Sequence, residues 1–239
     1  MKKLTVVFAL LVFIIFQSHA FAGSLGDPFD GNALKNPEWE WQNEPNWDIG
    51  ETNNGWIHIN AANGQNLWDV DTVAKLYQLV NTDKIDVATH IVMDYAGTAS
   101  CVSGLLIKSP SDVDWTTMKF WGRAGDAILQ WQHKQAEVVG TVPGSNQPAG
   151  RVEVFIRIAK SGNEYTGYWK KTADEEWIEV TPANKALTPP LEVGIFAGNC
   201  EAGGTMTAEF EYFEDMINPF AAVDSSGKCA TTWASLKSF

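Results

Sequence analysis

The chain has few cysteines, few histidines and few basic residues, and each shortage narrows the class of protein. Three cysteines and four histidines occur among 239 residues, and none has the spacing of a zinc site. Seventeen Lys and Arg residues stand against 29 Asp and Glu residues, for a formal net charge of −12. An acidic surface of this kind repels nucleic acid and anionic membranes, so neither is an expected partner. It also argues against a highly anionic polysaccharide, although a local basic patch could override the overall charge.

Several motifs that mark enzyme classes are also absent. The sequence has no G-x-S-x-G nucleophile motif, no Walker-type phosphate loop and no G-x-G-x-x-G dinucleotide motif. It therefore gives no support to serine-hydrolase or nucleotide-dependent chemistry.

The long apolar run of the chain lies at its N-terminus. Lys2 and Lys3 precede the apolar segment 4–16, and residues 20–22 have the A-x-A form of a cleavage site. This order predicts a signal peptide over residues 1–22, since the run is too short for a membrane span; an uncleaved anchor is the alternative. Removing these residues, which carry two lysines and no acid, leaves about 217 residues with a net charge near −14. We therefore expect a secreted or periplasmic protein.

All three cysteines lie in the exported part, where disulfides can persist. Cys101 and Cys200 both lie at the ends of strand-like runs, so they are the predicted pair. Three cysteines leave one thiol over and the connectivity open, with Cys229 as the remaining residue.

The rest of the sequence consists of short alternating runs bounded by Gly, Pro, Asn and Asp, which is typical of an all-β sandwich. In residues 151–159, for example, the even-numbered positions are aliphatic and predict an inward face. We expect one β-sandwich domain over residues 23–217, followed by a surface tail over residues 218–239. The predicted strands are 55–60, 85–95, 103–108, 116–122, 127–133, 151–159, 164–170, 176–180, 191–197 and 205–213.

Five segments in order carry a resemblance to a known family. They are PEWEWQNEPNWDI (37–49), LYQ (76–78), SGLLI (103–107), VFIRIAKSGNEYTGYWKKTADEEWIEV (154–180) and LEVGIFAGN (191–199). Together they resemble the β-xylosidase C-terminal concanavalin A-like domain family, within the lectin/glucanase superfamily. The resemblance covers about residues 28–215. It implies a jelly-roll of two curved antiparallel sheets with a concave face that can hold carbohydrate in relatives. The turn TADEE departs from the family's usual Asp-Gly, which affects only a loop.

The acidic run EFEYFED nearly matches the E-x-D-x-x-E run of lichenase- and laminarinase-type glucanases. Retaining glycosidases need two carboxyl groups roughly 5 Å apart. A regular strand puts Glu209 and Glu211 on one face and Glu214 on the other, and only a β-bulge would reunite them. We therefore interpret the run as a closing strand with Phe210 and Tyr212 packed inward, and assign no catalytic residue.

Eleven tryptophans make stacking on sugar rings plausible, because an indole offers an apolar face and a polar N–H. Large aromatics also fill sandwich cores, and we place Trp39, Trp41, Trp56 and Trp177 there. The better ligand candidates lie on two strand-like runs, DWTTMKFWGR and ILQWQHK, in which the polar and apolar residues alternate. The predicted ligand-binding residues are Lys119, Trp121, Arg123, Gln130 and Gln132, with Trp68 and Trp115 at the rim and Arg157 if its strand is central.

Acidic residues near both ends of the domain suggest a metal. The first and last strands of this architecture are often neighbours, so Asp27 or Asp30 is expected near Asp215. Hard oxygen ligands of this kind suit a structural Ca²⁺, although acidic turns are common and there is no EF-hand loop. No cofactor is required by this interpretation.

The sequence therefore predicts a secreted, non-catalytic carbohydrate-binding module that uses the concave sheet face. A glycan-cleaving glycosidase or lyase of the same fold and a structural or adhesion domain without a sugar ligand are the alternatives. The identity of the sugar is not predicted.

Overall fold

The computed structural model describes residues 24–68, 70–96, 100–110, 114–134, 138–201 and 204–220. The described residues form 17 strands in two antiparallel sheets and no helix, so the all-β prediction is confirmed. Accordingly, no helix long and apolar enough to span a membrane occurs in this part of the chain. The predicted signal peptide, Cys229 and the tail beyond residue 220 lie outside the described residues.

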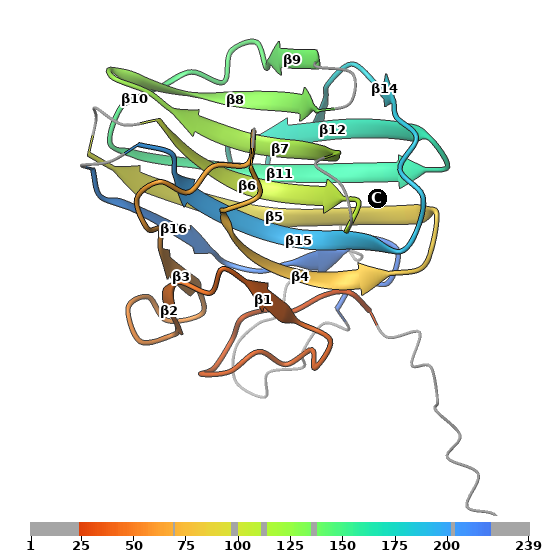
Figure 1. Ribbon diagram of the computed structural model, residues 1–239, viewed down its shortest axis with the longest axis horizontal. Coiled ribbons are helices and arrows are strands. Elements are labelled where there is room, and N and C mark those ends of the chain that lie inside the picture. Colours follow the sequence, from red (N-terminus) through yellow and green to blue (C-terminus); the bar gives the residue numbers. More distant parts are fainter. Residues whose placement is uncertain are drawn as a thin grey trace, which may run out of the picture.

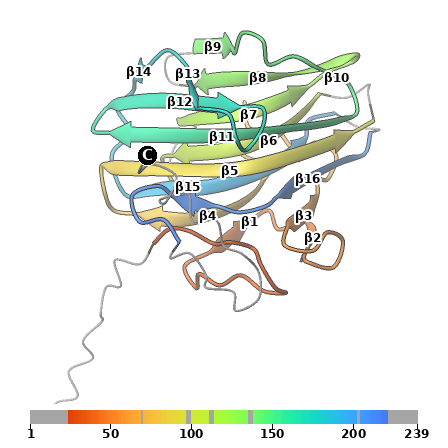
Figure 2. The ribbon, with the colours of Figure 1, turned by 180° about the vertical axis from the view of Figure 1, so that it is seen from behind.

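The two sheets lie face to face. The eight-stranded sheet is in front in Figure 1, and the nine-stranded sheet is in front in Figure 2. The eight-stranded sheet runs in the order β1 (Glu40–Gln42), β4 (Ala74–Val80), β15 (Leu191–Asn199), β6 (Cys101–Lys108), β7 (Trp115–Gly122), β8 (Asp126–His133) and β10 (Gln147–Pro148), with β9 (Val138–Thr141) also paired to β8. The nine-stranded sheet runs in the order β13 (Ile178–Glu179), β12 (Glu164–Lys170), β11 (Arg151–Ser161), β5 (Lys84–Tyr95), β16 (Met206–Phe210), β3 (Ile57–Asn60) and β2 (Asn46–Ile49), with β14 (Ala183–Asn184) on β12 and β17 (Glu214–Asp215) on β5.

Alternation along the strands fills the space between the sheets. In β7 and β8, Met118, Phe120, Leu129 and Trp131 point inward into one large apolar cluster, as the sequence predicted. In β11 the even-numbered aliphatic positions from 152 to 158 join the same cluster. Because neighbouring residues of a strand point to opposite faces, the odd-numbered positions of β7 and the even-numbered positions of β8 face away from this core.

The acidic run contains the bulge that would bring its glutamates together. Phe210 pairs with Ile91 of β5, and Glu214 pairs with Ala88, so four steps along the run match three along β5. This one extra residue returns Glu214 to the outward face that carries Glu209. Phe210 is buried as predicted, whereas the second inward position is filled by fully buried Phe213 and not by Tyr212.

The predicted disulfide between Cys101 and Cys200 is wrong, because both thiols are free. Cys101 lies opposite Asn199 and points into the core, where its Sγ contacts Asn199 Oδ1 at 3.7 Å. Cys200 follows Asn199 and therefore packs on the other face of the sheet. Two cysteines on opposite faces cannot bring their sulfur atoms together without moving the backbone. Burial raises the pKa of Cys101 to about 12, as expected for an inert thiol.

The two ends of the described domain are joined to each other. The backbone N–H of Asp27 donates to Phe213 O at 2.7 Å, and the N–H of Phe213 donates back to Asp27 O at 2.8 Å. The N–H of Leu25 also donates to Asp215 Oδ2 at 3.2 Å. The two ends of the described domain therefore lie together as predicted, through the Asp27–Phe213 and Leu25–Asp215 hydrogen bonds.

Candidate functional site

A pocket of about 360 Å³ opens on the face of the eight-stranded sheet that points away from the core. Six of the eight predicted ligand-binding residues line it: five lie on β7 and β8, which alternate as expected, and Trp68 lies in the loop before β4. The pocket also takes residues from the loop before β4, from the start of β6 and from the segment after β15. Its described lining is Asn66, Leu67, Trp68, Ser100, Val102, Trp115, Lys119, Trp121, Gln130, Gln132 and Cys200.

The floor of the pocket is set by the register of β6, β7 and β8. Lys119 of β7 lies between Gly104 of β6 and Gln130 of β8, and Val102 lies beside Trp121. A Cβ on Gly104 would lie 2.6 Å from the Lys119 Cα and 2.8 Å from its Cβ. Glycine at this position therefore lets β6 approach β7 closely enough to leave room for the lysine.

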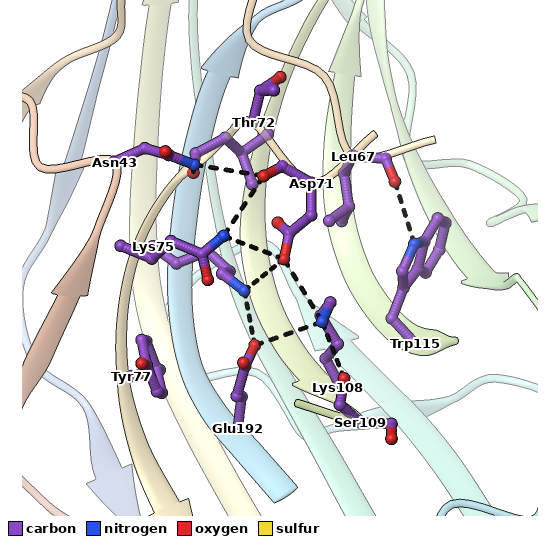
Figure 3. A network of polar contacts seen from close by, with 12 residues as sticks. Asn43, Leu67, Asp71, Thr72, Lys75, Tyr77, Lys108, Ser109, Trp115 and Glu192 are labelled. Carbon is purple, nitrogen blue, oxygen red and sulfur yellow. Dashed lines mark hydrogen bonds and ion pairs between the residues drawn. The ribbon is translucent and has the colours of Figure 1, made fainter. Parts of the chain in front are cut away.

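A loop between β3 and β4 builds one wall. The indole N–H of Trp115 donates to Leu67 O at 3.1 Å, a contact seen in Figure 3, and Gln65 N–H donates to Asn199 O at 3.0 Å. Leu67 joins a second apolar cluster outside the sandwich, with Val73, Val102, Leu106, Trp115 and Phe196. Trp115 is only 1% exposed and forms the base of this wall. The loop thus covers part of the sheet face and turns a flat surface into a pocket.

Two half-buried indoles supply the stacking surfaces. Trp68 packs edge-on against Trp115, with ring centroids 5.9 Å apart, and its backbone N–H donates to Asn66 Oδ1 at 2.7 Å. Trp121 is fixed by its indole N–H, which donates to Ser100 Oγ at 2.8 Å. Both rings are therefore held before any ligand arrives.

Lys119 is the charged group inside the pocket. Lys119 is only 5% exposed, and its Nζ donates a hydrogen bond to Gln130 Oε1 at 2.6 Å. Burial lowers the pKa of Lys119 to about 7, with a smaller opposing effect from the Cys200 thiol. The pocket therefore holds an amine that is ready to change its charge near neutral pH.

The structure does not bring the two predicted arginines into the lining. Arg123 lies over the Trp121 ring at 5.3 Å, but its guanidinium donates twice to Asp126, at 2.7 and 2.6 Å. Arg157 lies in β11 of the nine-stranded sheet, where it makes two 2.7 Å hydrogen bonds to Asp86. Arg123 is thus a rim residue, and Arg157 belongs to another surface.

The aspartates of the predicted calcium site accept hydrogen bonds from N–H groups. Asp27 Oδ2 accepts from Lys35 N–H at 2.7 Å, from Asn36 N–H at 3.0 Å and from the Trp39 indole at 3.1 Å. Asp30 forms an ion pair with Lys35, and Asp215 accepts from the backbone N–H groups of residues 25, 217 and 218. In the part of the chain that the structure describes, no group of three or more His, Cys, Asp or Glu side chains is arranged to hold a metal. Calcium at this closure stays a prediction.

A second polar cluster lies on the outward face of the nine-stranded sheet. His90 contacts Glu211 through Nδ1 at 2.7 Å and Glu153 through Nε2 at 2.9 Å, with Trp56 edge-on at 4.9 Å. Glu209 contacts His58 at 3.3 Å. Glu209 and Glu211 of the acidic run therefore have imidazole partners on a different surface from the pocket.

Two of the four tryptophans that we placed in the core lie elsewhere. Trp39 and Trp41 pack against the main cluster as predicted. Trp56 lies beside His90, and Trp177 is half-buried against the Lys170 ammonium, which is 5.0 Å from its ring. Both sit on the outward side of the nine-stranded sheet, because His90 and Phe155, which stack at 3.9 Å, point away from the core.

Sequence reasoning missed five residues of the lining. Val102 lies one residue before a predicted strand and Cys200 three residues after another, and extending the alternation would have placed both on the outward face. Asn66, Leu67 and Ser100 lie outside strands, where alternation gives no signal.

Comparison with known proteins adds information on the fold. No protein-family model and no curated protein sequence match the chain. Among solved structures it is similar to a xylan β-1,4-xylosidase from Bacillus halodurans C-125, at 16% identity and a TM-score of 0.58, over 79% of this chain and 38% of that one. A GH43B protein of the Bacteroides ovatus xyloglucan PUL gives 16% and 0.61, over 80% and 38%. A functionally unknown protein from Saccharomyces cerevisiae gives 14% and 0.58, over 77% and 98%.

These likenesses define the class of fold. The chain spans less than two fifths of the length of the two carbohydrate-active proteins and nearly all of the yeast protein. The chain therefore has a β-sandwich fold that also forms part of GH43 proteins and occurs alone in another protein. At these identities the similarity extends to the fold and not to the site.

Proposed function

We propose that the protein is a secreted, non-catalytic carbohydrate-binding module whose ligand occupies the pocket on the eight-stranded sheet. The observation that carries this proposal is the convergence of Trp68, Trp115 and Trp121 with Lys119 and two glutamines in one pocket. Indole faces stack on the C–H faces of sugar rings, and amide and ammonium groups exchange hydrogen bonds with hydroxyls. A mainly apolar pocket with a few placed polar groups is the usual form of a small-ligand site.

The volume and the rigidity of the pocket support the same function. A space of about 360 Å³ is on the scale of a site for a small ligand. The ring of Trp121 is held by Ser100, and Trp115 is held by Leu67. Side chains that are already ordered lose less entropy when a ligand binds, which favours affinity.

A glycan-cleaving enzyme is the second candidate, and one observation favours it. The bulge between β16 and β17 brings Glu214 to the face that carries Glu209, and Glu211 contacts His90 on the same sheet. Most glycosidases use a pair of carboxyl groups that face the same substrate. The pocket itself has no carboxylate among its described lining residues, so the two functions use different surfaces and can be separated by mutation.

The test combines a glycan array of neutral and acidic oligosaccharides with an assay for released reducing ends and unsaturated products. Binding is expected without product release. Trp121→Ala should weaken binding by about tenfold or more, because it removes a stacking surface. Trp177→Ala is the matched control, since Trp177 is also half-buried but lies on the other sheet, and it should leave binding unchanged.

The other outcomes distinguish the alternatives. Product release that Glu211→Gln abolishes and Trp121→Ala spares would replace the binding function by the enzymatic one. An array without any bound glycan, together with recovery of a protein partner, would overturn both and favour a structural or adhesion role.

A further inference from the structure

We infer that the sugar bound in this pocket carries a carboxylate, as a uronic acid does, and that the carboxylate pairs with Lys119. This inference rests on the proposed function and adds the chemical class of the ligand. It is carried by the way in which Lys119 differs from other buried lysines of the same sheet.

Two lysines on the same face show how this fold normally accommodates a buried ammonium. Lys75 and Lys108, whose side chains are 0% and 3% exposed, lie beside Asp71 and Glu192 in a cluster of two positive and two negative groups (Figure 3). Lys75 Nζ is 2.7 Å from Asp71 Oδ2 and 2.5 Å from Glu192 Oε2. Each ammonium therefore has carboxylate oxygens within reach, as a buried charge requires.

Lys119 is buried to a similar degree but has a different partner. Its Nζ donates to the neutral amide oxygen of Gln130, and no ion pair joins it to a carboxylate of the described residues. An ammonium has three N–H donors, so donors remain for a ligand. A carboxylate in the pocket would supply both the missing negative charge and the missing acceptors.

The lining around Lys119 does not oppose an anion. The Arg123 guanidinium over Trp121 is already paired with Asp126, and the Lys134 ammonium lies 3.9 Å from the centre of the Trp68 ring. The described lining holds no Asp or Glu that would repel a carboxylate. The net charge of −12 opposes a long anionic polymer, whereas one acidic sugar in the pocket is affected mainly by the charges nearest to it.

The depressed pKa of Lys119 makes the preference depend on pH. The groups that face Lys119 are the Cys200 thiol, followed in the chain by Glu201, and the neutral side chains of Gln130, Val102 and Trp121. A bound carboxylate favours the charged form of the amine and raises its pKa above about 7. Binding is therefore strongest where the amine is already protonated, below pH 7, and weakens as pH rises.

The experiment compares glycosides that differ only at C6, namely methyl glucuronoside and methyl galacturonoside against methyl glucoside and methyl galactoside. Affinity is measured by tryptophan fluorescence and by calorimetry on the intact protein at pH 6 and pH 9. At pH 6 the uronosides are expected to bind about tenfold more tightly than their neutral counterparts, as for one charge-assisted contact. At pH 9 this preference should be largely lost.

Two substitutions complete the test. Lys119→Gln should bring the uronosides to the affinity of the neutral sugars at both pH values. Lys84→Gln is the control: it removes an exposed lysine of β5 and changes the net charge by the same amount as Lys119→Gln. It should retain the preference for uronosides.

The failures of the two proposals are distinguishable. Neutral glycosides that bind as well as uronosides, or a preference that survives Lys119→Gln, would overturn the carboxylate inference and leave carbohydrate binding intact. Absence of binding by every glycoside and by the glycan array would overturn both.

Discussion

At the scale of single residues, two buried titratable groups lower the stability of the fold at pH values where they would carry charge. Lys119 lies in the pocket and has no carboxylate partner among the described residues, and His133 lies between the sheets, 1% exposed, with its Nδ1 3.0 Å from Thr116 Oγ1. Burial lowers the pKa of both. Lys119 faces the pocket, whereas His133 faces the core. Burying a charged group costs stability in both cases, but only the lysine is placed where its charge could serve a function.

Lys119→Met is expected to stabilise the protein. The pKa of this amine is about 7 in the folded state and 10.5 in the unfolded state, so below pH 7 the native state bears the full cost of the buried charge. The gain should be about 2–4 kcal/mol at pH 6, after loss of the Gln130 hydrogen bond, and most of it should be gone by pH 9.5. Urea unfolding at the two pH values measures it; a variant that is destabilised equally at both would contradict the assignment.

Acid should destabilise the protein through His133. Burial and the nearby Lys185 ammonium lower the pKa of His133 from 6.5 to about 4. Between these pH values the imidazole is protonated in the unfolded state but neutral in the native state. The histidine contribution to stability is complete above pH 6.5 and falls by about 3 kcal/mol as the pH decreases to 4. Urea unfolding across this range should show a shallower pH slope in His133→Gln than in the unmodified protein. Equal slopes would exclude His133 as the cause.

At the scale of elements, the loop between β3 and β4 forms one wall of the pocket. It carries Leu67 into the second apolar cluster and Asp71 into the ion cluster of Lys75 and Lys108. Gln42 of β1 also donates to Asp71 Oδ2 at 3.3 Å. The loop is therefore anchored at both ends of its contact with the sheet, by apolar packing near the pocket and by charge farther along β4 and β15.

Removing one charge from this cluster should cost stability. Asp71→Asn leaves Lys75 and Lys108 with Glu192 as their nearest carboxylate, and unbalanced buried charge is expensive. We expect a loss of about 2–4 kcal/mol in the free energy of unfolding, measured in urea. Asp174→Asn, at an exposed turn, is the control and should stay within about 0.5 kcal/mol of the unmodified protein. Two variants of equal stability would show that the cluster contributes nothing.

The pocket residues on strands could be predicted from the sequence, whereas those in loops could not. Alternation placed Lys119, Trp121, Gln130 and Gln132 on one outward face, because side-chain direction in a strand follows residue parity. It could not reveal that Arg157 lies in the other sheet, since parity says nothing of which strands are neighbours. The loop residues Asn66 and Leu67 were found only by the structure, because their position depends on contacts with distant strands. The acidic run was read as a regular strand because a bulge has no fixed sequence signal.

At the scale of the whole molecule, the order of weak motifs was enough to predict the sandwich. The two-sheet architecture is confirmed, and alternation in β7, β8 and β11 supplies most of its inward face. The predicted closeness of the chain's first and last elements is also present, at Asp27 and Phe213. Whether a calcium ion joins the two ends cannot be predicted from the sequence, because a carboxylate in a sequence can equally bind a cation or accept hydrogen bonds from N–H groups.

Thermal unfolding in calcium and in EDTA separates the two possibilities. Hydrogen bonding by Asp27 and Asp215 predicts the same midpoint in both solutions, whereas a bound ion predicts a higher midpoint in calcium. Asp27→Asn should lower stability by about 1–3 kcal/mol, because Oδ2 alone accepts from three N–H groups. The exposed Glu51→Gln variant serves as a control. A midpoint that rises with calcium in the unmodified protein and not in Asp27→Asn would establish the metal site.

The closure between the two ends also sets the order in which the molecule can assemble. The Leu25 N–H reaches Asp215 across 190 positions of sequence, and Gln65 in the wall of the pocket is bonded to Asn199. Contacts between such distant segments form late, because the chain must first pay the entropy of a very large loop. We therefore expect folding in the range of about milliseconds to seconds, with the pocket completed near its end. Until β15 and β16 have joined, the edges of β4, β5 and β6 remain unpaired, and that interval is when the chain is most exposed to misassociation.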